Sequence, residues 1–187
     1  MSKELWKAGN MLYPVPAVMV TVGDGADISN IVTIAWTGTI NSDPAMVSIS
    51  VRKSRYSHEL LMKNGEFVIN LVTRELTYAM DYCGVKSGRD VDKFLETKLT
   101  RGEGKTVSVP VIAESPVNIE CKVTQVIELG SHDMFLANVS GVQVDSKYLD
   151  STGKFDLQAA DLIAYSHGQY YTLGENIGKF GYSVQKK

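Results

Sequence analysis

The chain has 187 residues, of which 44% are hydrophobic and 21% are charged, a balance typical of soluble globular proteins. This length suits one sizeable core, so we expect residues 1–187 to form a single domain. The formal net charge of −2 gives no general attraction to nucleic acid or to an anionic membrane. The chain start lacks a signal-peptide pattern, and the apolar run at residues 11–22 contains two prolines and is too short to cross a bilayer. We therefore expect a cytoplasmic protein that binds neither nucleic acid nor membrane.

The first half of the chain alternates β-like runs with short helical patterns. We predict strands at residues 17–22, 30–36, 46–51 and 67–71, and short helices at residues 59–63 and 75–82. A turn is indicated at residues 23–25, and Pro44 closes a loop between the second and third of these strands. After a glycine-rich loop at residues 84–90, we expect Asp90 to cap a helical turn through residues 93–95.

The second half favours antiparallel strands. Apolar and polar residues alternate from Val117 to Thr124, which predicts a strand with one buried and one exposed face. A turn at residues 130–133 leads to a strand at 134–144, and a last short strand is expected at 161–165, before an aromatic tail at 166–187. Many short strands with few helices are typical of an antiparallel barrel or sandwich.

Cations gather just before the first predicted helix. Arg52, Lys53 and Arg55 precede Ser57 at the start of that helix. The free N–H groups of a helix start favour anions, so this arrangement is a natural place for a phosphate. A basic surface loop without a ligand is the alternative, and the local pattern leaves both interpretations open. Because the cluster is local in a chain of net charge −2, it favours a small anion over a polymer.

Other common site signatures are missing from the sequence. The histidines, His58, His132 and His167, and the cysteines, Cys83 and Cys121, lack metal-ligand spacing, so we expect no metal site. Neither a dinucleotide-binding or Walker glycine pattern nor a nucleophile elbow is present. The turn histidine, His132, has two interpretations: its side chain reaches a pocket, or it satisfies nearby backbone groups.

Five segments occur in a characteristic order and spacing. They are N-I-V-T-I-A-W at 30–36, S-I-S-V-R-K-S-R-Y-S at 48–57, G-E-F-V-I-N-L at 65–71, S-G-R-D-V-D-K-F at 87–94 and G-S-H-D at 130–133. Together they resemble the flavin reductase-like, FMN-binding split-barrel family, and its flavoredoxin branch in particular. The resemblance implies a mainly β fold: an antiparallel six-stranded split β-barrel with a few short helices, with its core at about residues 14–165. It also implies that the protein binds FMN, usually as a homodimer.

The resemblance assigns positions to the parts of the flavin. The ring would lie along the backbone of Thr33, Ile34, Ala35 and Trp36, and the loop that follows would bring Asn41 near the ring or the ribityl chain. The phosphate would be held by a loop that contains Ser50, Arg52, Lys53, Tyr56 and Ser57. We expect Arg55 of this loop to face solvent, and Ser87 and Gly88 to let a second loop approach the cofactor closely.

Three further residues would act in catalysis. Lys93 would lie near the flavin and stabilise negative charge on the reduced ring. His132 would orient a nicotinamide or pass a proton, and Tyr165 would stack on the flavin or the nicotinamide. Without the resemblance, Trp36 is interpreted as a core aromatic and Lys93 as an exposed lysine.

The function implied is an oxidoreductase in which NADH or NADPH reduces FMN and the flavin passes electrons to a second acceptor, such as a protein. The main alternative is an FMN-binding electron carrier with no enzymatic activity. A relative of pyridoxamine-phosphate oxidases would need a second basic pocket, and the sequence has a single basic cluster. A plain β-barrel that binds another phosphorylated ligand is the remaining alternative. The sequence does not decide whether FMN is a resident group or a substrate.

Overall fold

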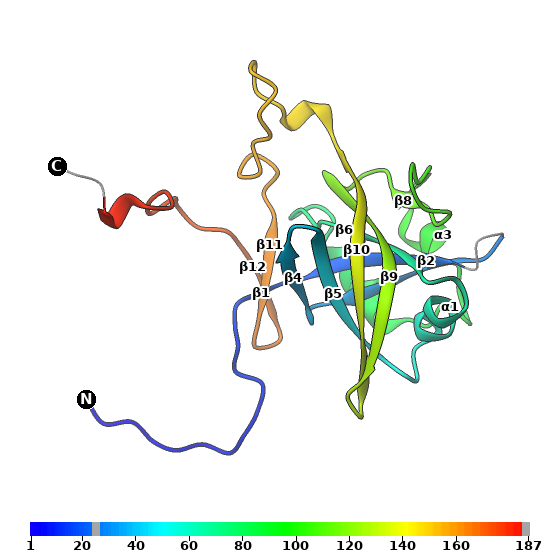
Figure 1. Ribbon diagram of the computed structural model, residues 1–187, viewed down its shortest axis with the longest axis horizontal. Coiled ribbons are helices and arrows are strands. Elements are labelled where there is room, and N and C mark those ends of the chain that lie inside the picture. Colours follow the sequence, from blue (N-terminus) through cyan, green and yellow to red (C-terminus); the bar gives the residue numbers. More distant parts are fainter. Residues whose placement is uncertain (24–26, 185–187) are drawn as a thin grey trace.

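The computed structural model describes residues 1–23 and 27–184 (Figure 1). Within these residues the long strands are β2 (Val18–Gly23), β3 (Ser29–Ile34), β4 (Thr37–Ser42), β5 (Ala45–Arg52), β6 (Glu66–Asn70), β9 (Val117–Glu128) and β10 (His132–Val144). The short strands are β1 (Val15–Pro16), β7 (Arg101–Gly102), β8 (Val111–Ile112), β11 (Ile163–Ser166) and β12 (Gln169–Thr172). The helices are α1 (Tyr56–Asn64), α2 (Thr77–Val85) and α3 (Lys93–Thr97), with 3-10 turns η1 (Ser146–Tyr148) and η2 (Tyr182–Val184).

The long strands form one seven-stranded sheet in the order β3-β2-β6-β9-β10-β5-β4, with antiparallel pairing throughout. Its two edge strands, β3 and β4, are consecutive in the chain and are separated only by Ala35 and Trp36. The pairing of β4 with β5 continues one residue before β4, where the Ser50 backbone N–H donates to the Trp36 carbonyl oxygen at 2.9 Å. The expected mainly β, antiparallel structure with a few short helices is confirmed.

The main sheet has seven strands, where six were expected. Residues 37–42, expected to lie in a loop, form the edge strand β4, which pairs with β5. The pattern T-G-T-I-N-S has no apolar alternation because its side chains from Gly38 onward are all exposed. Backbone hydrogen bonds to β5 therefore define this strand, and the sequence carries little trace of them.

Two further expectations are corrected, and a third lies largely outside the described residues. The tail contains a strand, β12, which pairs with β11, while β11 pairs with β1 to make a three-stranded sheet. The residue that caps α3 is Asp92, whose carboxylate accepts from the N–H groups of Phe94 and Leu95, and Asp90 does not have this role. The turn predicted at 23–25 begins at Gly23, the end of β2, and its other two residues lie outside the described part of the chain.

The alternation predicted one exposed face along the strand β9, but part of that face is buried. Glu120 on its polar face is fully buried, and its carboxylate accepts hydrogen bonds from Lys105, Thr106 and Gln143. Burial raises the pKa of Glu120, but these hydrogen bonds outweigh it and hold the pKa at about 2. The loop at 103–108 therefore covers this face of the sheet through a polar contact, which hydrophobic patterning does not reveal.

Apolar side chains from six of the seven strands form the main core, to which β4 adds none, and α1 closes it through Leu60 and Leu61. A second core lies where α2 and α3 pack against β2 and β3, with Met80 and Phe94 almost fully buried. The strand β3 is thus fixed from both sides. No helix in the described residues is long and apolar enough to cross a membrane.

Candidate functional site

A groove runs along β3 and consists of two neighbouring cavities. The aromatic cavity, about 250 Å³, is lined by residues 32–36 and 50–52 together with Ala17, Arg55, His132, Tyr165 and Tyr170. The cationic cavity, about 140 Å³, is lined by residues 54–57 and 86–88 together with Asn30, Val32 and Lys93. Val32 and Arg55 line both cavities, so the two are adjacent.

Lys93 is a buried lysine at the base of the cationic cavity, with 4% of its surface exposed. Its Nζ donates to the carbonyl oxygens of Ile31 at 2.6 Å and Cys83 at 2.7 Å. An ammonium group has three donors, so one remains for a ligand. Burial, and to a smaller extent the charge of Arg55, lower the pKa of Lys93 to about 8. A ligand that brings negative charge would relieve both effects.

Positive charge in the cationic cavity is not compensated by the protein. Arg55, Lys86 and Lys93 line it, and among the described lining residues there is no carboxylate. None of these three cations forms an ion pair within the described part of the chain. The cavity is therefore suited to an anion.

Neutral polar groups complete the cationic cavity. Ser57 and Asn30 are both buried, and the Asn30 side-chain amide donates to the Ser57 hydroxyl at 2.9 Å. Ser57 lies in the first turn of α1, whose N-cap, Arg55, makes no side-chain capping bond. Free N–H groups at this helix start therefore lie beside the cations.

The loop between α2 and α3 approaches β3 very closely at Gly88. A Cβ atom placed on Gly88 would lie 2.1 Å from the Asn30 Oδ1 atom, so no other residue fits without a shift. The Ser87 hydroxyl accepts from the Arg89 backbone N–H at 3.1 Å, which fixes the turn at this point. The loop at Ser87 and Gly88 thus approaches Asn30 closely, and its expected approach to the cofactor stays a prediction.

Aromatic rings form the wall of the aromatic cavity opposite β3. The ring centroid of Tyr165 lies 5.8 Å from that of Tyr170 and 5.9 Å from that of Tyr13, which also lies 6.2 Å from that of Trp36. The Tyr170 hydroxyl donates to the Asp81 carboxylate at 2.6 Å. Burial and this carboxylate raise the pKa of Tyr170 to about 12, so the phenol stays protonated. The bond anchors the β11–β12 hairpin to α2.

His132 stands where the aromatic cavity meets a larger one. This entrance cavity, about 780 Å³, shares Ala35, Trp36, Ser50 and His132 with the aromatic cavity and is also lined by residues 9–12. The Nδ1 of His132 lies 2.9 Å from the Ser131 hydroxyl, and in the strand register His132 pairs with Arg52. Burial and the charge of Arg52 lower the pKa of His132, so its neutral form predominates at pH 7.

Most of the residues implied by the resemblance line this groove, but two lie elsewhere. Lys53 pairs with Glu128 at 2.6 Å and lies 3.3 Å from Asp133, and it lines neither cavity. Asn41 is exposed on β4, where its side chain donates to the Pro44 carbonyl oxygen at 2.8 Å.

The groove also changes the positions expected for two implied residues. Arg55, expected to face solvent, lines both cavities. Lys93 lines the cationic cavity, away from the cavity that contains His132 and Tyr165. Thr33 lines the aromatic cavity, and its hydroxyl donates to the Met80 carbonyl oxygen, which leaves its backbone for the proposed contact with the ring.

The comparison with known families identifies the family of this chain. A family model described as "Flavin reductase like domain" matches residues 10–174. The chain belongs to the flavin reductase-like family. An uncharacterized protein of Archaeoglobus fulgidus is 30% identical over 165 residues, which cover 88% of this chain and 91% of that protein.

Solved structures agree with the family and its fold. A flavoredoxin of Desulfovibrio vulgaris (Miyazaki F) is similar with a TM-score of 0.91 and 30% identity, covering 98% of this chain and 100% of that one. A flavoredoxin from Methanosarcina acetivorans gives a TM-score of 0.86 and 26% identity, with coverage of 98% and 100%. The expected flavin reductase-like split barrel is confirmed, as is the resemblance to flavoredoxins.

Among the groove residues of this flavin reductase-like chain that were not singled out from the sequence are Asn30, Lys86 and Tyr170. Asn30 starts the first family segment, and a polar residue amid an apolar strand was an available signal. Lys86 borders the glycine-rich loop, and Tyr170 lies in the tail. No local pattern separates these two from ordinary surface residues.

Proposed function

We propose that this protein is an FMN-binding oxidoreductase of the flavin reductase or flavoredoxin type, which uses NADH or NADPH as electron donor. The flavin ring lies in the aromatic cavity along residues 33–36, and the phosphate lies in the cationic cavity. When bound there, FMN supplies the redox chemistry, by accepting a hydride and passing on electrons. The protein supplies binding, orientation and charge.

The observation that carries this proposal is the uncompensated charge of the cationic cavity. Buried Lys93 and nearby Arg55 repel each other, and the lining contributes no carboxylate among the described residues. Such a site favours a bound anion, and it adjoins a cavity whose walls are aromatic. A phosphate on a flat ring system, which is the shape of FMN, satisfies both requirements.

In this arrangement Lys93 binds the phosphate of FMN, in place of the role at the flavin ring that the sequence suggested. Its free N–H, with Arg55, the Ser57 hydroxyl and the start of α1, would hold the phosphate oxygens. Arg52 and Ser50, which line the aromatic cavity, would contact the ring side of the cofactor. A Lys93→Met variant with normal FMN affinity but an altered flavin reduction potential would instead indicate that Lys93 lies beside the flavin ring.

The entrance cavity is the proposed place for the nicotinamide. It reaches the aromatic cavity at Trp36 and His132 and is open on its outer side, so a donor can approach the ring and leave. The neutral imidazole of His132 can accept or donate one hydrogen bond there. Tyr165 lines the aromatic cavity, which is the proposed place of the flavin ring.

The test is to add FMN to the flavin-free protein and then mix the complex with NADH or NADPH without oxygen. We expect a yellow complex whose flavin absorbance bleaches within seconds with at least one nucleotide. A protein that takes up no FMN would refute the proposal.

A non-enzymatic electron carrier is the second candidate. The observation in its favour is the apolar rim of the entrance cavity, where Leu12 is 85% and Leu129 is 55% exposed, which suits contact with a partner protein. A yellow complex that neither nucleotide bleaches, but that a reduced electron-transfer protein does bleach, would favour this candidate.

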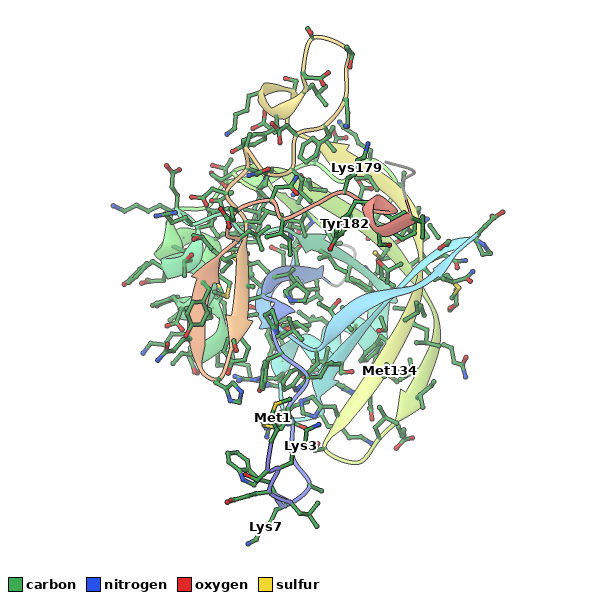
Figure 2. The ribbon with its side chains drawn as sticks, turned by 90° about the vertical axis from the view of Figure 1, so that its left-hand side faces the viewer. Met1, Lys3, Lys7, Met134, Lys179 and Tyr182 are labelled. Carbon is green, nitrogen blue, oxygen red and sulfur yellow. The ribbon has the colours of Figure 1, made fainter. Side chains whose placement is uncertain are left out.

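We further propose that the protein forms a homodimer. The N-terminal arm and the C-terminal tail extend from the same side of the molecule (Figure 1), and Figure 2 shows Met1, Lys3 and Lys7 on an arm below the folded body. Trp6 is 74% and Phe180 is 106% exposed, and a second copy would cover such side chains. Light scattering after size-exclusion chromatography tests this, and a monomeric mass would contradict it.

A further inference from the structure

The cationic cavity is bordered by a second hollow that the flavin mononucleotide does not need. This outer hollow, about 350 Å³, is lined by residues 27–29 and 88–92 together with Tyr56 and Arg101. Tyr56 and Gly88 line both spaces, so they form the partition between them. FMN ends at its phosphate, whereas FAD continues through a second phosphate to adenosine. What lies at this partition therefore affects which of the two flavins fits.

Three side chains close the partition. The guanidinium of Arg89 lies over the Tyr56 ring, with Cζ 4.9 Å from the ring centroid. Its Nη2 also donates to the Glu59 carboxylate at 2.7 Å, on the helix that carries Tyr56. The loop at 87–89 is in this way fastened to α1 beyond the phosphate end of the groove. A chain that leaves the cationic cavity in this direction has to separate these groups.

Charge changes sign across the partition. On the inner side, Arg55, Lys86 and Lys93 have no paired carboxylate in the described residues. On the outer side, both cations are already paired: Arg89 with Glu59, and Arg101 with Asp92 at 2.8 Å.

Two more carboxylates, Asp27 and Asp90, also line the outer hollow. A first phosphate is therefore attracted to the inner side, while a second phosphate beyond the partition meets carboxylates and cations that are already paired.

We propose that the Tyr56–Arg89–Glu59 cluster is a specificity determinant that selects the flavin mononucleotide over the dinucleotide. This inference rests on the proposed function, because it places the FMN phosphate in the cationic cavity. The cluster consists of exposed contacts that are individually weak, so its contribution to selection is about tenfold.

The experiment compares the dissociation constants of riboflavin, FMN and FAD for the flavin-free full chain, followed by flavin fluorescence. We expect FMN to bind more tightly than riboflavin, and at least about tenfold more tightly than FAD. Arg89→Ala opens the partition and should reduce the FAD-to-FMN ratio of dissociation constants several-fold, with FMN affinity almost unchanged. Asp90→Asn, which removes an outer carboxylate, should change the ratio in the same direction by a smaller factor.

Arg74→Ala is the matched control, because Arg74 forms an exposed pair with Asp161 and lines neither space. Its ratio should equal that of the unaltered protein. Equal affinities for FMN and FAD in the unaltered protein, or an unchanged ratio in Arg89→Ala, would overturn this inference while leaving the proposed function intact. A failure to bind any of the three flavins would instead overturn the proposed function, and this inference with it.

Discussion

The two ends of the groove are built on different physical principles. At the cationic end, buried Lys93, Ser57 and Asn30 hold fixed hydrogen bonds, and Gly88 packs directly on Asn30. At the aromatic end, the rings of Trp36, Tyr165 and Tyr170 are partly exposed, and the cavity opens into a larger one. One end is preorganised and enclosed, and the other is loosely packed and accessible.

This difference indicates a division of work. A preorganised charged site supplies affinity, since its donors need no reordering when an anion binds. An open aromatic site gives less affinity but admits a second molecule to the reacting ring. We therefore expect changes at the cationic end to affect mainly flavin affinity, and changes at the aromatic end to have smaller effects on affinity. The predictions below test that contrast.

The largest effect is expected from Lys93→Met, which keeps the side-chain length but removes the buried charge. The loss of a charge-assisted contact costs about 1.5–3 kcal/mol, so FMN affinity should fall roughly 10- to 100-fold. Fluorescence titration measures this change. Lys147→Ala is the control, because Lys147 pairs with Asp145 on an exposed turn. Similar FMN affinity in both variants would remove Lys93 from the phosphate site.

Gly88→Ala should be the next most damaging change, because the new Cβ would lie 2.1 Å from Asn30 Oδ1. Relief of this overlap moves the loop and should cost about 1–3 kcal/mol of stability, with FMN affinity lowered roughly tenfold. Gly174→Ala is the matched control, since nothing lies within 4 Å of its Cβ position. Chemical denaturation and FMN titration measure the two effects, and equal behaviour of the variants would contradict the steric argument.

The pH dependence of binding should follow Lys93, whose pKa is about 8 in the folded protein and 10.5 in the absence of structure. As pH rises above about 8, Lys93 loses its charge and FMN affinity should fall several-fold. The stability of the flavin-free protein should change in the opposite direction, because between these two pKa values the unfolded chain binds more protons.

Titrations between pH 7 and 9.5 test the pH dependence. Lys93→Met should lose the decline in affinity, and a decline that persists in this variant would assign it to another group.

The smallest effect is expected at the aromatic end, from Tyr170→Phe. This change removes the hydrogen bond to Asp81 at 2.6 Å but keeps the ring, so FMN affinity should fall by about 1 kcal/mol or less. Tyr171→Phe is the matched control on the same strand, because its hydroxyl donates to Gln169 away from both cavities. A loss larger than that of Lys93→Met would reverse the proposed contrast between the two ends.

Local sequence patterns were sufficient for much of the architecture. Alternating and apolar runs located strands at 17–22, 46–51, 67–71 and 134–144 close to their observed positions, because burial on a sheet imposes a period that the sequence records. The basic segment beside the start of α1 and the five ordered segments also indicated the family, which the comparisons confirmed. The edge strand β4 was missed, since backbone pairing alone defines it.

The orientation of each cation was decided only by the tertiary structure. Lys53 and Arg55 are two residues apart in one basic segment, yet Lys53 pairs with Glu128 and Asp133, while Arg55 lines the groove. Asp133 and Glu128 are far from Lys53 in the sequence, so no local pattern shows that they pair with it. The local sequence likewise predicts that Lys93 is exposed. It is buried, and carbonyl oxygens of β3 and α2 accept its hydrogen bonds. The sequence by itself determined the residue types of the site, and long-range packing decided which of them face the ligand.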